Sequence, residues 1–212
     1  SSPGEQVYLF SSDANTNLTG HSHGFAFGAA ADGISFGRYV NSVGEEQFPA
    51  QISPAFCAAN SGPAVGPVVI NEIHYHPAPG GDEFLELKNI TTSAVPLFDP
   101  TLPMNTWTLN GLNFTFPTNV VIPPDGLLLL VSTNPAVFTE KYSVPSNVLV
   151  LGPWSGALQD SGERLALERP GTPDTNGVPR IVVDAVRYND KTPWPAVADG
   201  AGPSLQRKIA AA

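Results

Sequence analysis

Histidine supplies the first candidate chemistry of this sequence. Its four histidines fall into two His-x-His pairs, His21 with His23 and His74 with His76. Residues two apart on a β-strand share a face, so each pair would present two imidazoles together, and Glu72 lies on the same face as His74. Such groups bind zinc-type divalent ions, although two ligands do not complete a tetrahedral site. We therefore weigh a structural or adventitious divalent metal at these residues against exposed histidines without a ligand, and we expect no resident cofactor.

Carboxylates supply a second candidate, a calcium site. Four of them cluster on two strands that we expect to pair, namely Glu72, Asp82, Glu83 and Glu86. Hard oxygen ligands of this kind bind Ca²⁺, and a bound ion would stabilise a chain whose single cysteine cannot form an internal disulfide. A solvated acidic face would contain the same residues, and it is the simpler interpretation.

Tryptophan offers a third possibility, carbohydrate binding. Trp154 lies in a turn between Gly152 and Gly156, where an exposed ring would stack on a sugar and a ring folded back over the core edge would serve packing alone. We expect Trp107 and Trp194 to anchor the core or its rim. Binding of a glycan through exposed aromatic rings such as Trp154 therefore stands as an alternative function.

Several motifs of catalysis are missing from the sequence. It has no phosphate-binding loop, dinucleotide fingerprint or His-Glu-x-x-His motif. Cys57 lies among small residues, without an identified base, and is interpreted as a free thiol. We predict that the protein is not an enzyme.

Composition narrows the fold class and the partners. The 212 residues include 20 Gly and 22 Pro, too many helix-breaking residues for a helical bundle. Charged residues make up 14% and hydrophobic residues 42%, which does not fit a disordered chain. A net charge of −9 repels phosphate, so we expect no nucleic acid partner. The longest apolar run, Leu127–Val131, is far shorter than a membrane helix, so we expect no membrane insertion.

The positioning elements are predicted to be short strands separated by Gly and Pro turns. The segment 83–89 alternates leucines with charged residues, which predicts a half-buried strand. One short helix is predicted at Pro135–Tyr142, because Asn134 can cap it and Pro135 suits its first position. Together these elements indicate an all-β, antiparallel sandwich or barrel. Further strands are predicted at 68–73, 106–109, 112–116, 127–132, 148–151, 164–168 and 181–188.

An internal repeat divides the chain. Ser2–Phe10 parallels Asp160–Glu168, because each runs from a turn through Gly-Glu into an alternating apolar strand. Downstream of each lies Ala-Asp-Gly, at 31–33 and 198–200, followed within eight residues by arginine. We interpret residues 1–53 as the C-terminal part of a preceding module, 54–67 as a linker, and 68–209 as a complete module.

These markers, taken in order, resemble the lamin-tail domain in its bacterial form. The resemblance rests on Val69–Pro77 and Asp82–Asn89 as the first two strands, and on later markers at 107–109, 123–126, 161–163, 183–184, 193–195 and 198–205. It implies an immunoglobulin-like β-sandwich with at most one short helix, and a family without catalytic residues. The N-terminal segment departs from the pattern because it lacks the first two strands.

The resemblance implies a non-catalytic module of a larger secreted or cell-surface bacterial protein that serves in adhesion, spacing or partner binding. The partner is expected to be a protein or a cell-surface polysaccharide. Carbohydrate binding by exposed aromatics and metal binding by the His-x-His pairs are the alternatives. The apolar residues Val7, Leu9, Phe25, Phe27 and Phe36 need cover, so we expect the N-terminal part to dock on the complete module or on a second chain.

Overall fold

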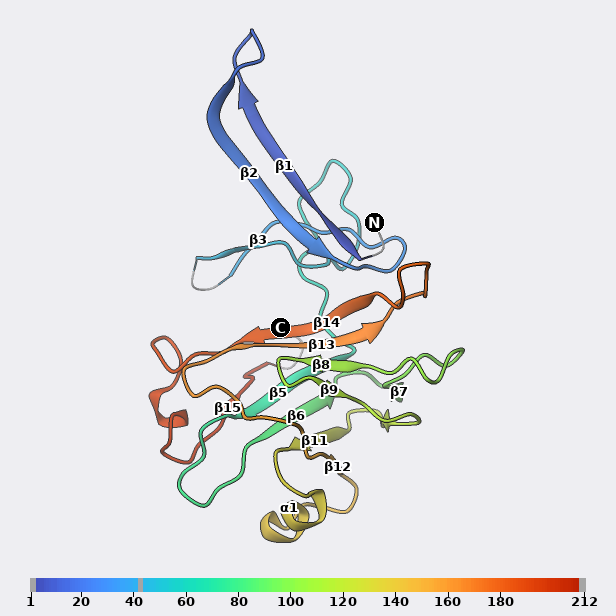
Figure 1. The fold of residues 1–212 in the computed structure, drawn as a ribbon, viewed down its shortest axis with the longest axis vertical. Helices are drawn as coiled ribbons and strands as arrows, with labels where there is room; N and C mark the ends of the chain where they lie inside the picture. Colours follow the sequence, from blue (N-terminus) through green and yellow to red (C-terminus); the bar gives the residue numbers. More distant parts are fainter. Residues whose placement is uncertain (1–2, 42–43, 210–212) are drawn as a thin grey trace. The chain divides into compact units, whose positions relative to one another are not determined.

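The computed structural model describes residues 3–41 and 44–209, and strands form nearly all of its regular structure (Figure 1). The chain divides into two units. The first comprises Ser1–Ala64 with Gly171–Ile181, and the second comprises Val65–Pro170 with Val182–Ala212. The division after Ala64 falls inside the segment suggested as a linker, while the assignment of residues 1–53 to a partial module stays a prediction.

Two sheets form the body of the second unit. The five-stranded sheet has the order β12-β11-β6-β5-β15, and the four-stranded sheet has the order β14-β13-β8-β9. The first contains β5 (Val68–His74), β6 (Phe84–Asn89), β11 (Leu127–Val131), β12 (Leu149–Leu151) and β15 (Leu205–Gln206). The second contains β8 (Thr108–Asn110), β9 (Phe114–Thr115), β13 (Arg164–Pro170) and β14 (Arg180–Arg187). A further pair joins β7 (Val95–Pro96) to β10 (Val121–Ile122).

Apolar side chains of both sheets form one core. Along β6, Leu85 and Leu87 are buried while the residues between them are partly exposed, as the alternation predicts. The same core contains leucines from β11 and from β8 and β13 of the other sheet: Leu128, Leu130, Leu109, Leu165 and Leu167. Burial of facing apolar surfaces is the main force that holds two sheets together. The fold is therefore the all-β, immunoglobulin-like sandwich that the sequence predicts.

Strand β11 is buried on both faces, which explains its unbroken apolar sequence. While Leu128 and Leu130 join the sandwich core, Leu129 and Val131 pack with Phe138 in a second cluster. Phe138 belongs to α1 (Pro135–Tyr142), so this helix covers the outer face of the five-stranded sheet.

Helix α1 has the predicted bounds and the predicted cap. The Asn134 side chain accepts a hydrogen bond of 2.9 Å from the backbone N–H of Ala136. The helix also connects β11 to β12, which pair in parallel rather than antiparallel. A parallel pair needs a crossover connection, and α1 supplies it, so this pairing departs from the purely antiparallel arrangement expected.

The first unit contains the long hairpin of β1 (Gly4–Ser12) and β2 (Leu18–Gly28), and the short pair of β3 (Tyr39–Val40) and β4 (Glu46–Gln47) (Figure 1). Part of the cover predicted for its phenylalanines comes from the unit itself. Phe48 stacks on Phe25 with ring centroids 3.7 Å apart, and Phe36 lies 5.3 Å from Phe27. Phe48 was not assigned this role from sequence, because only tertiary structure brings it to β2.

Every strand predicted for the second unit is present within a few residues of its expected bounds. The sequence missed β7, β10 and β15, which have two residues each and no measurable alternation. None of the helices among the described residues is long and apolar enough to cross a membrane.

We expect Phe138→Ala to lower the free energy of unfolding by about 3 kcal/mol, because it opens a cavity in the cluster under α1. Val137 on the same helix is 56% exposed and Phe138 only 3%. The matched change Val137→Ala should therefore cost less than about 0.5 kcal/mol. Urea unfolding followed by tryptophan fluorescence measures both. Equal losses would contradict the assignment of the helix to this outer face.

Candidate functional site

Three of the predicted metal ligands lie on β5 or directly after it. Ile73 and Tyr75 point into the core, so Glu72, His74 and His76 lie on the opposite side, as the two-residue spacing predicts. A bulge at Asn71 shifts the register with β6 and places Glu72 directly opposite Glu86.

The three side chains on that side have separate partners. The Nε2 atom of His74 lies 2.9 Å from the carbonyl oxygen of Gly202, and Nδ1 of His76 lies 2.6 Å from Oδ1 of Asp199. Glu72 accepts a hydrogen bond from the hydroxyl of Ser204. Throughout residues 3–41 and 44–209, no group of three or more His, Cys, Asp or Glu side chains could hold a metal ion. The structure therefore does not bring the predicted ligands of β5 together around one point.

The other histidine pair lies on β2, and its members also have different surroundings. His21 is exposed, whereas Nε2 of His23 lies 2.7 Å from Oε2 of Glu46. Arg38 donates a hydrogen bond from Nε to the same carboxylate. The hydrogen bond from His23, and to a smaller extent the one from Arg38, holds the pKa of Glu46 below its usual value. Glu46 thus binds both His23 and Arg38, a pairing that the sequence analysis missed.

Each of the four carboxylates considered for calcium has hydrogen-bond or ion-pair partners of its own, and that of Glu72 is the Ser204 hydroxyl. Asp82 forms an ion pair with Lys141 and accepts a hydrogen bond from the Tyr142 hydroxyl. Glu83 accepts a 3.2 Å bond from the backbone N–H of Leu158, and Glu86 accepts one of 2.7 Å from the Asn71 amide. Burial raises the pKa of both Glu83 and Glu86. These side chains therefore join loops and strands of the sandwich rather than converge on a shared ligand.

Asp199 follows the short helix η1 (Ala196–Ala198) and attaches its loop to His76, just after the end of β5. Besides the bond to His76, the backbone N–H of Gly200 donates to the carbonyl of His76 at 3.0 Å. The carboxylate of Asp199 thus binds the imidazole of a residue 123 positions earlier in the chain. The hydrogen bond to Asp199 is the main reason that the pKa of His76 is raised above its usual value.

Trp154 is part of the core and presents no open stacking face. Its side chain is 6% exposed and packs in the sandwich core together with Trp107, while Trp194 is partly buried against the same core. The structure thus agrees with the packing role considered for Trp154. Tyr142 is more exposed, and its hydroxyl is engaged with Asp82.

An ion pair closes the sandwich beside the bulge of β5. Asp184 of β14 accepts a 2.8 Å hydrogen bond from the backbone N–H of Ile70 and a 2.7 Å bond from Nη2 of Arg207. Arg207 in turn donates from Nε to the carbonyl of Ile70 at 3.1 Å. The two side chains are only 11% and 20% exposed. They therefore satisfy backbone groups of β5 that lie beyond the end of β15, and they connect the two sheets.

The sequence singles out both residues of this pair but does not show that they interact. Asp184 and Arg207 both belong to the repeated or ordered markers, but nothing in the spacing shows that they meet. Residues 23 positions apart meet here only because β14 and β15 belong to facing sheets.

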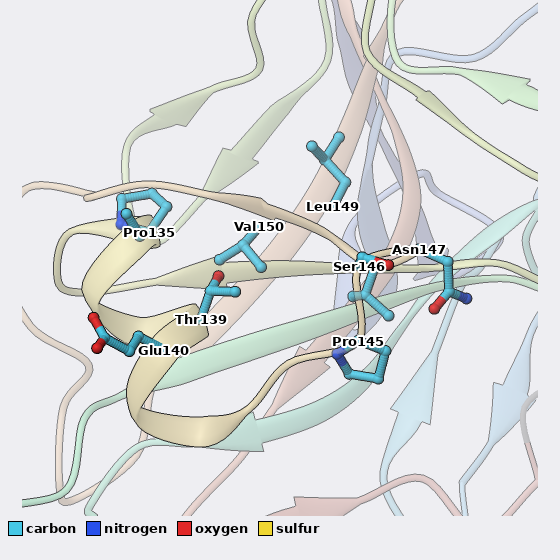
Figure 2. A pocket seen from close by; sticks show the side chains of 10 residues that line it. Pro135, Thr139, Glu140, Pro145, Ser146, Asn147, Leu149 and Val150 are labelled. Carbon is cyan, nitrogen blue, oxygen red and sulfur yellow. The ribbon is translucent and has the colours of Figure 1, made fainter.

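A shallow groove lies between α1 and the segment that leads into β12. Figure 2 shows its lining side chains, which come from Pro135–Glu140 on one side and from Pro145–Val150 on the other. Glu140 is the one ionisable residue of this lining. A single carboxylate has no second group to act as its acid or base partner, so the groove offers no catalytic arrangement.

A comparison with protein families now connects this geometry to a known type of domain. A family model described as Lamin Tail Domain matches residues 61–190, more than half of the chain. The chain belongs to the lamin-tail domain family. The match contains the strands from β5 to β14 and therefore nearly all of the sandwich. No curated protein matched the chain.

We expect Asp199→Asn to lower the pKa of His76, because the carboxylate that favours the imidazolium is lost. NMR titration of the imidazole measures this shift, and Glu140→Gln is the control that should leave it unchanged. The raised pKa means that the pair stabilises the fold fully below the unfolded-state pKa and loses this contribution as pH rises through the folded-state pKa. An unchanged His76 titration in the Asp199 variant would contradict the pairing.

A second prediction concerns the ion pair that closes the lamin-tail domain. Asp184→Ala leaves the N–H of Ile70 and the Arg207 guanidinium without this acceptor, so we expect a loss of about 3 kcal/mol in unfolding free energy. Asp184→Asn keeps an oxygen acceptor and should cost roughly half as much. Glu140→Ala, an exposed acid on α1, should cost less than about 0.5 kcal/mol. Denaturant unfolding measures these losses. If the Asp184 variants lose no more free energy of unfolding than the Glu140 control, Asp184 does not stabilise the sandwich in this way.

Proposed function

We propose that this chain is a non-catalytic module of a larger secreted or surface bacterial protein, and that it serves in adhesion by binding a protein or polysaccharide partner. The lamin-tail domain and its immunoglobulin-like fold fit a non-catalytic module. The ionisable residues that the sequence singled out support this interpretation, because those of β5, β6 and β14 hold loops and strands in place.

The observation that carries the proposal is the apolar surface of β1. Val7, Tyr8, Leu9 and Phe10 are consecutive and are 53%, 54%, 72% and 55% exposed. Large contiguous apolar patches on soluble proteins commonly mark binding sites. Because side chains alternate along a strand, Val7 and Leu9 lie on one face of the hairpin, and Tyr8 and Phe10 on the other.

The aromatic face of the hairpin suits both kinds of partner. The Tyr8 and Phe10 rings have centroids 6.3 Å apart, and Gly24 on β2 leaves room for the Tyr8 ring to lie against the backbone. Exposed rings on a strand can pack against apolar side chains of a protein or stack on sugar rings. This pair takes the place of Trp154 as the platform for the carbohydrate alternative.

The test uses beads coated with the full chain and suspensions of whole bacterial cells. We expect coated beads to adhere to cells more strongly than albumin-coated beads. The double variant Tyr8→Ser/Phe10→Ser should reduce adhesion roughly tenfold, as expected when anchoring aromatic residues are removed. Protease treatment of the cells abolishes adhesion if the partner is a protein, and periodate treatment abolishes it if the partner is a polysaccharide.

A matched variant keeps this test specific. Tyr39 and Phe56 are also exposed aromatic residues of the first unit, so Tyr39→Ser/Phe56→Ser removes two rings outside the hairpin. This variant should adhere as the unchanged chain does. Adhesion no stronger than that of albumin, or an equal loss in both double variants, would refute the proposed role of the hairpin.

A further inference from the structure

Strand β1 has an edge to which no strand is bound. Among the described residues, β1 pairs with β2 alone in a two-stranded sheet. Alternate N–H and C=O groups of an edge strand point outward and can accept another strand. Two strands alone are also marginal as an independent sheet, and three or more are usually needed.

The described edge strands of the sandwich have the usual protection against pairing, and β1 lacks it. Strands β9 and β15 have two residues each and β12 has three, while β14 carries Arg180, Asp184 and Arg187. In β1, the run from Gln6 to Ser12 contains neither a charged residue nor a proline. Short edges, charges and prolines are the features that normally prevent edge pairing.

Strand β13 of the sandwich, which the sequence pairs with β1 as its counterpart in the predicted repeat, has a neighbour on each edge. Gly4 and Gly162 both have a positive φ, +103° and +98°. A side chain at Gly4 would collide with the backbone of β2, and one at Gly162 with the backbone of Tyr188 and Asn189, just after β14. Gly4 is the first residue of β1, and Gly162 lies two residues before β13. The second edge of β13 pairs with β8, where Leu167 lies opposite Leu109. The equivalent edge of β1 is the open one.

We propose that the open edge of β1 pairs antiparallel with β1 of a second copy of this chain, around a two-fold axis at Tyr8. The sequence Gly4–Ser12 is self-complementary in this register. Val7 of one copy lies opposite Leu9 of the other, Gln6 lies opposite Phe10, and the two Tyr8 residues face each other. A symmetric interface of this kind closes after two copies.

Charge does not oppose this register. Each copy has a net charge of −9, and like charges directly opposite would weaken the pairing. The single charged residue of β1, Glu5, lies opposite Ser11 of the second copy in the proposed register. The combined sheet has the order β2-β1-β1-β2 and therefore reaches the number of strands that an independent sheet requires.

The pairing uses the edge of β1 and leaves the face of Tyr8 and Phe10 open. It is therefore independent of the adhesion proposed above. A dimer would present two such faces together, which raises adhesion to a repetitive surface through multivalency.

Sedimentation analysis of the full chain over a concentration series tests this dimer. We expect a monomer–dimer equilibrium in the unchanged chain. Val7→Glu/Leu9→Glu places two pairs of like charges opposite each other across the axis and should weaken dimerisation roughly tenfold. Val7→Lys/Leu9→Lys should do the same. A mixture of the two variants should recover dimerisation, because each Glu then faces a Lys.

Controls separate edge pairing from charge and from misfolding. Met104→Glu/Val197→Glu adds the same charge at two exposed apolar residues of the second unit and should leave the dimer unchanged. Circular dichroism verifies that the variants keep their strands. The proposal is overturned by a chain that stays monomeric at every concentration, by a dimer that both charged variants retain, or by a mixture that fails to associate.

Discussion

The structure depends on one constraint, which is that every strand needs cover for its apolar side chains and hydrogen-bond partners for both edges. The sandwich meets it in several ways. Leu85 and Leu87 of β6 face the opposing sheet, and α1 covers the outer side of β11. Where β15 ends, Asp184 and Arg207 bind the backbone of Ile70 in place of a strand. In the second unit, side chains therefore bind backbone groups that the short strands leave without a neighbouring strand.

The same constraint explains what the polar residues do. Carboxylates that are partly buried are costly unless they are hydrogen-bonded, and Glu83 and Glu86 both have such partners. Glu83 binds the backbone of Leu158, and Glu86 binds the amide of Asn71. His76 and Asp199 join the end of β5 to a distant loop. These histidines and carboxylates, which the sequence offers as metal ligands, thus connect strands and loops of the sandwich.

The sequence predicted the elements well and their partners poorly. The alternation of 83–89, the apolar run of β11 and the cap at Asn134 are local signals, and each element formed where its signal lies. Strands of two residues, such as β7, carry no such signal. The parallel pairing of β11 with β12 and the contacts of His23, His76 and Arg207 join residues far apart in sequence, so no spacing rule could have found them. Burial of Trp154 was undecided for the same reason, because a turn sequence does not show which way its ring folds.

The strands of the sandwich have neighbours or short, charged edges, while β1 has an open edge that we propose a second copy occupies. Amide hydrogen exchange of the full chain, measured residue by residue at low and high protein concentration, tests it most directly. We expect strong protection in β6, β11 and β13 at both concentrations, and protection of alternate amides in β1 that rises with concentration. Protection in β1 that equals that of β13 at low concentration, or that does not change with concentration, would exclude pairing of β1 with a second copy.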